Sequence, residues 1–85
     1  MSPPTDAALL SEITDIMRDL FDDDALEITP AFSRTDNELW DSMNHLNLVF
    51  ALESKYKIKF SIVDIEEMQS VGDIMKLVEK KTGKA

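Results

Sequence analysis

Ser42 is the residue whose position is most favourable for chemistry. It stands in the order Leu39-Trp40-Asp41-Ser42-Met43, where an irregular stretch gives way to apolar residues at helical spacing. The first turn of a helix leaves backbone N–H groups without intrahelical partners and carries the positive end of the helix dipole. A phosphodiester on the Ser42 hydroxyl is therefore stabilised there. The alternative is that Asp41 or Ser42 only caps the helix.

The other candidate reactive groups do not assemble into a recognised site. The sequence has no cysteine and only one histidine, His45. Neither a metal site nor a Ser-His catalytic pair is therefore supported. A calcium loop counted from Asp22 places Glu27 where glycine is needed and Ser33 where a bidentate glutamate belongs. We therefore expect no metal and no enzymatic activity. As an exposed residue beside Ser42, His45 could tune partner docking with pH.

Length and charge point to a small carrier or binding module. The chain has 85 residues, which we interpret as one domain (residues 1–85, with a core of about 6–82) too small for an elaborate catalytic cavity. The net charge of −8 disfavours nucleic acid and favours partners with basic docking surfaces. Neither a signal segment nor an apolar run long enough to cross a membrane is present in the sequence, so we expect a cytoplasmic protein without a membrane partner.

Helical spacing predicts the elements that must position Ser42. Apolar residues at helical spacing from Leu9 to Phe21 predict a first helix, with Thr5 as a plausible N-cap and an end near the run Asp22-Asp23-Asp24. From there to Asp41 no period is sustained, which predicts a long loop held by scattered apolar anchors. Loops of this length are unusual and tend to be functional. The anchors are Ile28, Phe32, Leu39 and Trp40.

The second half of the chain predicts three more helices. The one that begins at Asp41-Ser42 has a wide apolar stripe, formed by Met43, Leu46, Val49, Phe50, Leu52 and Tyr56 and widened by Leu48 and Ala51. Residues 57–60 are interpreted as a loop. Two capping-box patterns, Ser61 with Asp64 and Ser70 with Asp73, then start a short third helix and an amphipathic fourth.

These blocks, in this order, resemble the acyl carrier protein family, the phosphopantetheine-binding four-helix carriers. The resemblance covers roughly residues 6–82. Asp41-Ser42-Met43 looks like the Asp-Ser-Leu motif of the family with methionine in place of leucine, and it is followed by Leu48-Val49-Phe50-Ala51-Leu52-Glu53. Ser70-Val71-Gly72-Asp73-Ile74 looks like the start of the last helix in the family. The implied fold is an all-α four-helix bundle with a long loop between helices one and two and a short third helix.

The resemblance implies a function and a set of site residues. Ser42, preceded by Asp41, is expected to accept 4′-phosphopantetheine from coenzyme A through a separate phosphopantetheinyl transferase. The arm then carries an acyl or aminoacyl group as a thioester, loaded by a ligase and delivered to downstream transferases or synthases by a stand-alone, monomeric carrier. Residues beside the arm are expected to contact partners, namely Met43, Asn44, His45, Asn47 and Phe50. Five apolar positions match the acyl cavity of the family, although ordinary core packing explains them as well: Val49, Leu52, Phe60, Ile65 and Met68.

Three departures from the family pattern qualify this interpretation. Asn44 and Asn47 stand where the family often has acids, which suggests docking by shape and apolar contact and a specialised biosynthetic pathway. Trp40 replaces a small residue, and we interpret it as a loop anchor rather than a cover over the arm.

The alternative function is a non-covalent acidic helical module that binds a partner through Met43 and Phe50, with Ser42 as a cap only.

Overall fold

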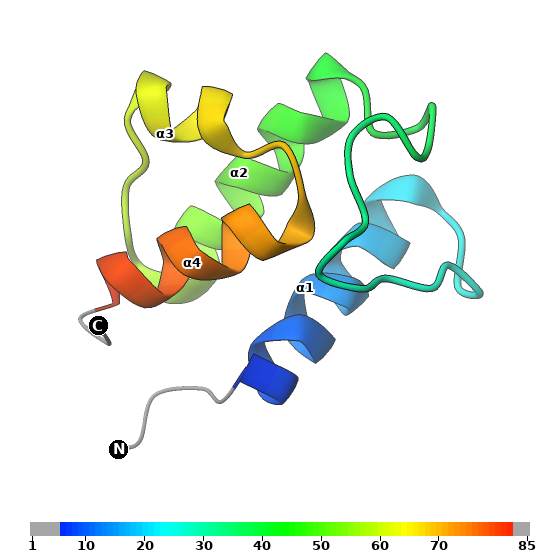
Figure 1. Ribbon diagram of the computed structural model, residues 1–85, viewed down its shortest axis with the longest axis horizontal. Helices are drawn as coiled ribbons and strands as arrows, with labels where there is room; N and C mark the ends of the chain where they lie inside the picture. Colours follow the sequence, from blue (N-terminus) through cyan, green and yellow to red (C-terminus); the bar gives the residue numbers. More distant parts are fainter. Residues whose placement is uncertain (1–5, 83–85) are drawn as a thin grey trace.

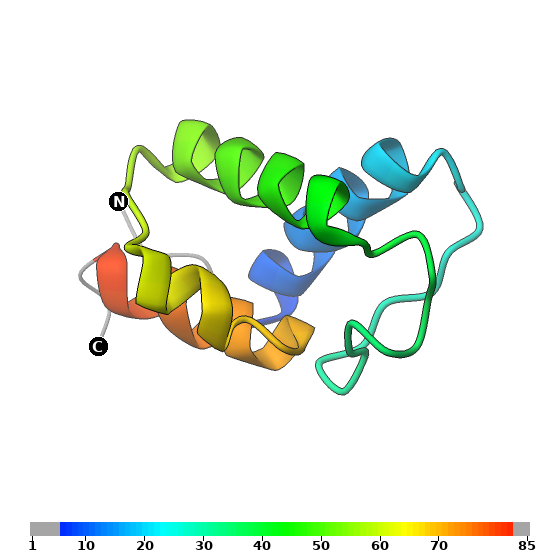
Figure 2. The ribbon, with the colours of Figure 1, turned by 90° about the horizontal axis from the view of Figure 1, so that it is seen from above.

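The computed structural model describes residues 6–82, which form four helices joined by loops (Figure 1). The helices are α1 (Asp6–Phe21), α2 (Ser42–Tyr56), α3 (Ile62–Glu67) and α4 (Val71–Lys81). Helix α1 packs against both α2 and α4. Seen from above, α2 lies on one side and α3 and α4 on the other (Figure 2). The predicted all-α bundle with a long first loop and a short third helix is confirmed. Thr5, the predicted N-cap, lies outside the described residues.

Local backbone geometry ends the first two helices where the sequence suggested. Asp22 adopts a left-handed conformation with φ of 53°, directly after the last residue of α1. Lys57 does the same with φ of 56°, and its N–H donates to the carbonyl of Glu53. Asp41 caps α2, because its side chain accepts a hydrogen bond of 2.9 Å from the N–H of Asn44.

Both predicted capping boxes are present. The N–H of Asp64 donates to Ser61 Oγ (3.1 Å) while the N–H of Ser61 donates to Asp64 Oδ2 (3.0 Å). Ser70 and Asp73 form the same pair of bonds at the start of α4. Asp64 also forms an ion pair with Lys81 (3.0 Å), which joins α3 to the end of α4. The hydrogen bond from Ser61 and the contact with Lys81 lower the pKa of Asp64.

Helix α2 buries a narrower face than the predicted stripe. Met43, Leu46 and Phe50 of the predicted stripe are 73%, 45% and 60% exposed, so this part of the stripe faces solvent. The buried positions are His45, Leu48, Val49 and Leu52. Apolar residues occur around most of the perimeter of this helix, and therefore their spacing alone could not determine which side faces the core.

The core collects apolar side chains from α1, α2 and α4 and from the loops between the helices, while α3 contributes no buried residue. A hydrogen bond from the Tyr56 hydroxyl to the Glu12 carboxylate joins α2 to α1 at its margin. Burial, together with this bond to a carboxylate, raises the pKa of Tyr56. The buried apolar residues are Leu9, Ile13, Met17, Phe21, Ile28, Trp40, Leu48, Val49, Leu52, Phe60, Met68, Val71, Ile74, Met75 and Val78.

The connector, residues 22–41, is fixed to the helices by hydrogen bonds along its length. Near its start, Arg18 Nε of α1 donates to the Leu26 carbonyl (2.7 Å). In its middle, the N–H of Arg34 donates to the carbonyl of Gln69 (3.0 Å), just before α4. A backbone bridge pairs Ser33 with Ser70 in the same place. The connector is therefore part of the folded core structure, although it has no regular secondary structure of its own.

The first turn of α4 supplies two further donors to the connector. The N–H of Val71 donates to the Phe32 carbonyl and the N–H of Gly72 to the Pro30 carbonyl, both at 2.9 Å. A side chain at position 72 would bring its Cβ to 3.1 Å from the Pro30 oxygen. Glycine therefore allows the close approach of these two backbones.

The two faces of α2 give a paired test of the fold. Leu48→Ala removes a fully buried side chain and is expected to lower the free energy of unfolding by about 2–5 kcal/mol. Leu46→Ala, at a residue that is 45% exposed, should cost less than about 1 kcal/mol. Urea unfolding followed by circular dichroism measures both. Equal losses in the two variants would show that the orientation of α2 is wrong.

Candidate functional site

Ser42 is exposed at the first position of α2. The residue before it, Asp41, fixes the start of the helix, since its carbonyl accepts from the N–H of His45 (2.8 Å) and its side chain caps Asn44. The first turn of the helix contains no acidic residue. The hydroxyl is therefore accessible, at a point where the helix dipole favours an attached anion.

Asn44 ties the end of the connector to the first turn of α2. Its side-chain amide donates a hydrogen bond of 2.7 Å to the carbonyl of Leu39. The backbone before the serine is also turned tightly, because Asn37 accepts from the N–H groups of both Leu39 (2.8 Å) and Trp40 (3.0 Å). Asn44, which sequence analysis placed at the partner surface, thus also has a bracing role within the chain.

His45 is buried, so the expectation that it is exposed beside Ser42 is wrong. Only 3% of the residue is exposed. Its Nδ1 accepts a hydrogen bond of 2.9 Å from Trp40 Nε1, and its Nε2 lies 2.9 Å from the carbonyl oxygen of Ile65. Because indole N–H only donates and a carbonyl only accepts, the ring is neutral with its proton on Nε2. Burial lowers the pKa of His45, the bond to Ile65 partly opposes this, and the positive charge of Arg34 lowers it further.

Trp40 anchors the end of the connector, as the sequence suggested. It is 3% exposed, and its ring stacks on Phe32 with centroids 5.8 Å apart and planes at 10°. The indole N–H is satisfied by His45, so the ring is held at its edge and on its face. The side chain faces the core and does not cover the serine.

Exposed apolar side chains occur on both α2 and α3. On α2 these are Met43, Leu46 and Phe50, and the predicted partner residue Asn47 is exposed on the same helix. On α3 they are Ile62 and Val63, which are 77% and 61% exposed and which sequence analysis did not single out. No sequence pattern identified them, because a helix of six residues is too short for apolar spacing to define its buried face.

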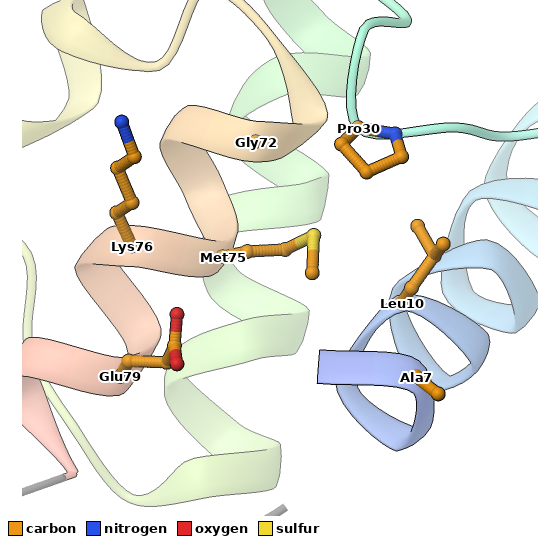
Figure 3. A pocket seen from close by; sticks show the side chains of 7 residues that line it. All are labelled: Ala7, Leu10, Pro30, Gly72, Met75, Lys76 and Glu79. Atoms are coloured by element: carbon orange, nitrogen blue, oxygen red, sulfur yellow. The ribbon is translucent and has the colours of Figure 1, made fainter. Parts of the chain in front are cut away.

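The five predicted acyl-cavity residues belong to the packed interior. Val49, Leu52, Phe60 and Met68 are buried in the core, and Ile65 is partly buried against it. An apolar pocket of about 330 Å³ lies elsewhere, between the start of α1, the connector and α4. Figure 3 shows Met75 reaching from α4 toward Leu10 of α1 across this pocket. Its lining is Ala7, Leu10, Pro30, Gly72, Met75, Lys76 and Glu79. The acyl cavity between α2 and α3 therefore stays a prediction.

Two further classes of site are absent from residues 6–82. Within that range, His, Cys, Asp and Glu side chains do not gather in any group of three or more that could hold a metal ion. None of the helices in the same range has the length and apolar character needed to cross a membrane.

Known proteins with similar sequences and structures are acyl carrier proteins. No family model matches the chain. The acyl carrier protein of Thermotoga maritima is 29% identical over 75 residues, which cover 88% of this chain and 93% of that protein. The meromycolate extension acyl carrier protein of Mycobacterium tuberculosis is 27% identical over 78 residues, covering 92% of this chain and 68% of that protein.

A solved structure extends the likeness to three dimensions. The solution structure of a holo acyl carrier protein from Geobacter metallireducens superposes with a TM-score of 0.81 at 41% sequence identity, covering 88% of this chain and 86% of that one. The helices, the connector and an exposed serine at the start of α2 agree with the sequence motifs. The chain therefore belongs to the acyl carrier protein family, whose members carry acyl groups on covalently attached 4′-phosphopantetheine.

Proposed function

We propose that Ser42 is the attachment residue for 4′-phosphopantetheine, and that the chain delivers an acyl or aminoacyl group between biosynthetic enzymes. Family membership gives the carrier class and the covalent cofactor. The observation that supports this particular serine is its exposed hydroxyl in the first turn of α2, beside the capping Asp41. A carrier acts as the substrate of other enzymes, and therefore needs no catalytic group of its own.

The local environment fits an attached phosphodiester. The first turn of α2 contains no acidic side chain to repel the phosphate, and the carboxylate of Asp41 is engaged by the N–H of Asn44. In the transfer that we propose, a separate transferase removes the Ser42 hydroxyl proton. The serine oxygen then bonds to phosphorus as the bond from phosphorus to the departing adenosine bisphosphate of coenzyme A breaks. The attached group supplies a terminal thiol, which holds the cargo as a thioester.

Intact mass spectrometry tests the attachment directly. After incubation with coenzyme A and a broad-specificity phosphopantetheinyl transferase, we expect the wild type to gain the mass of one phosphopantetheine group. Ser42→Ala should gain none, and Ser54→Ala, at an exposed serine on the same helix, should load like the wild type. An unmodified wild type would refute the carrier proposal and favour the non-covalent interaction module.

We also propose that partners dock on the exposed apolar side chains of α2 beside the arm. The side chains of Met43 and Phe50 are exposed to solvent instead of packing in the core. Large apolar side chains that cluster on a protein surface mark interaction sites. Asn44 and Asn47 place neutral amides at positions where the family often has acidic side chains. Contact here is therefore expected to depend on shape and apolar burial, while the net charge of −8 attracts basic partners over longer distances.

Phe50→Ala tests this docking surface. We expect it to reduce kcat/KM for the transferase by about tenfold, because large apolar side chains at interfaces contribute about 1–2 kcal/mol or more. Stability should change by less than about 1 kcal/mol, since the ring is 60% exposed. Ser54→Ala, at an exposed position on the same helix outside the predicted partner residues, is the matched control and should have little effect. Equal kcat/KM values in wild type and Phe50→Ala would contradict docking at this surface.

The neutral amides of Asn44 and Asn47 are also our basis for proposing a specialised pathway. Enzymes that recognise acidic carriers by charge pairing lose two expected partners at Asn44 and Asn47. Efficient chain elongation on the loaded protein by a standard fatty acid synthase set would contradict this proposal.

A further inference from the structure

His45 differs from every other polar residue in residues 6–82. It is the one polar side chain in that part of the chain that lies in the buried interior. Burying an ionisable ring costs free energy unless its polar atoms are hydrogen-bonded. The burial of His45, three residues after Ser42, therefore needs a physical reason. Both ring nitrogens have partners, and these partners belong to different elements of the fold.

The ring joins three segments around the proposed attachment residue. His45 itself lies in the first turn of α2. Its Nδ1 holds Trp40, two residues before Ser42 in the connector, and its Nε2 holds the carbonyl of Ile65 in α3, with both distances 2.9 Å. The ring therefore sets the position of the chain that enters α2 relative to α3.

We propose that His45 is a positioning residue for Ser42, and that it acts only while its ring is neutral. Protonation would place a second N–H on Nδ1, facing the N–H of the Trp40 indole. Two donors cannot form a hydrogen bond, so the link to the connector is lost, while Nε2 can still donate to Ile65. The indole of Trp40 would then lose its hydrogen bond and keep only its apolar contacts, among them the stacking on Phe32.

Burial of the ring and the positive charge of Arg34 in the connector oppose protonation of His45, while the hydrogen bond to the Ile65 carbonyl favours it. The same elements also carry carboxylates, which are not among the groups that shift the pKa of the ring: Asp36, Glu38 and Asp41 in the connector, and Asp64, Glu66 and Glu67 in α3. Burial dominates, so the pKa of His45 lies below its ordinary value of 6.5. The neutral ring, and with it the contact to Trp40, is therefore maintained at neutral pH and lost only in acid.

The contact can be followed without any modification of Ser42, because the chain has one tryptophan and one histidine. The emission of Trp40 in the unmodified protein is recorded from about pH 8 down to about pH 4. Wild type should show a transition with a midpoint below 6.5, while the far-UV ellipticity stays constant through it. His45→Gln, which can hydrogen-bond but does not titrate, should lack the transition. A transition shared by both proteins, or its absence from the wild type, would overturn the proposal.

Nitrogen NMR of the wild-type ring keeps the test independent of how well a variant folds. Long-range proton–nitrogen spectra at neutral pH should show an unprotonated Nδ1 and a protonated Nε2. A protonated Nδ1 at neutral pH would contradict the contact with Trp40.

The consequence for loading rests on the proposed attachment at Ser42. At neutral pH, His45→Ala should lower kcat/KM for the transferase by about tenfold, because the acceptor hydroxyl is less well positioned. His45→Gln should restore part of the loss. If wild type and His45→Ala load equally well, the positioning role is refuted. If neither protein is loaded, the attachment at Ser42 is refuted instead.

Discussion

The hydrogen bonds between the connector and the first turn of α4 are the constraint on which the rest of the structure depends. In an isolated helix the N–H groups of Val71 and Gly72 would have no backbone partner. Here the carbonyls of Phe32 and Pro30 accept them, so the same two bonds complete the start of α4 and hold the middle of the connector. An irregular chain thereby acquires a fixed path that ends at Ser42.

Because the connector is fixed, one side of α2 packs against the core and the other side faces solvent. Toward the core the helix presents His45, Leu48 and Leu52, which pack the bundle together. Toward solvent it presents Ser42 and Phe50, which can meet other proteins without disturbing that packing. In the proposed function, a single helix thus carries the attachment hydroxyl at its beginning and the docking surface along its outer side. Few other side chains are needed for a carrier.

Local sequence signals predicted much of the fold. The capping boxes at Ser61 and Ser70 and the end of α1 at Phe21 depend on neighbouring residues, and these are present in the sequence itself. The connector could be recognised as a pinned loop, and Trp40 as one of its anchors. Its hydrogen bonds to α4, however, join residues that are distant along the chain, and no local pattern records them.

The candidate site was predictable for its central residue and less so for the residues around it. The position of Ser42 follows from the helix start. The burial of His45 does not, because a polar residue on a helix with apolar residues on most sides gives no indication that a tryptophan and a carbonyl will satisfy its ring. For the same reason the outward orientation of Phe50 depended on tertiary packing. The exposed pair Ile62 and Val63 came from a short helix in which few residues determine the buried side.

Amide hydrogen exchange tests most directly whether the connector is a fixed part of the fold. The N–H groups of Arg34, Val71 and Gly72, which form its bonds to the segment before and within α4, are decisive. If the connector positions Ser42 as described, these three amides exchange slowly, with protection close to that of the core of α2. Exchange of Arg34 at the rate of an unfolded peptide, with α2 still protected, would contradict the account.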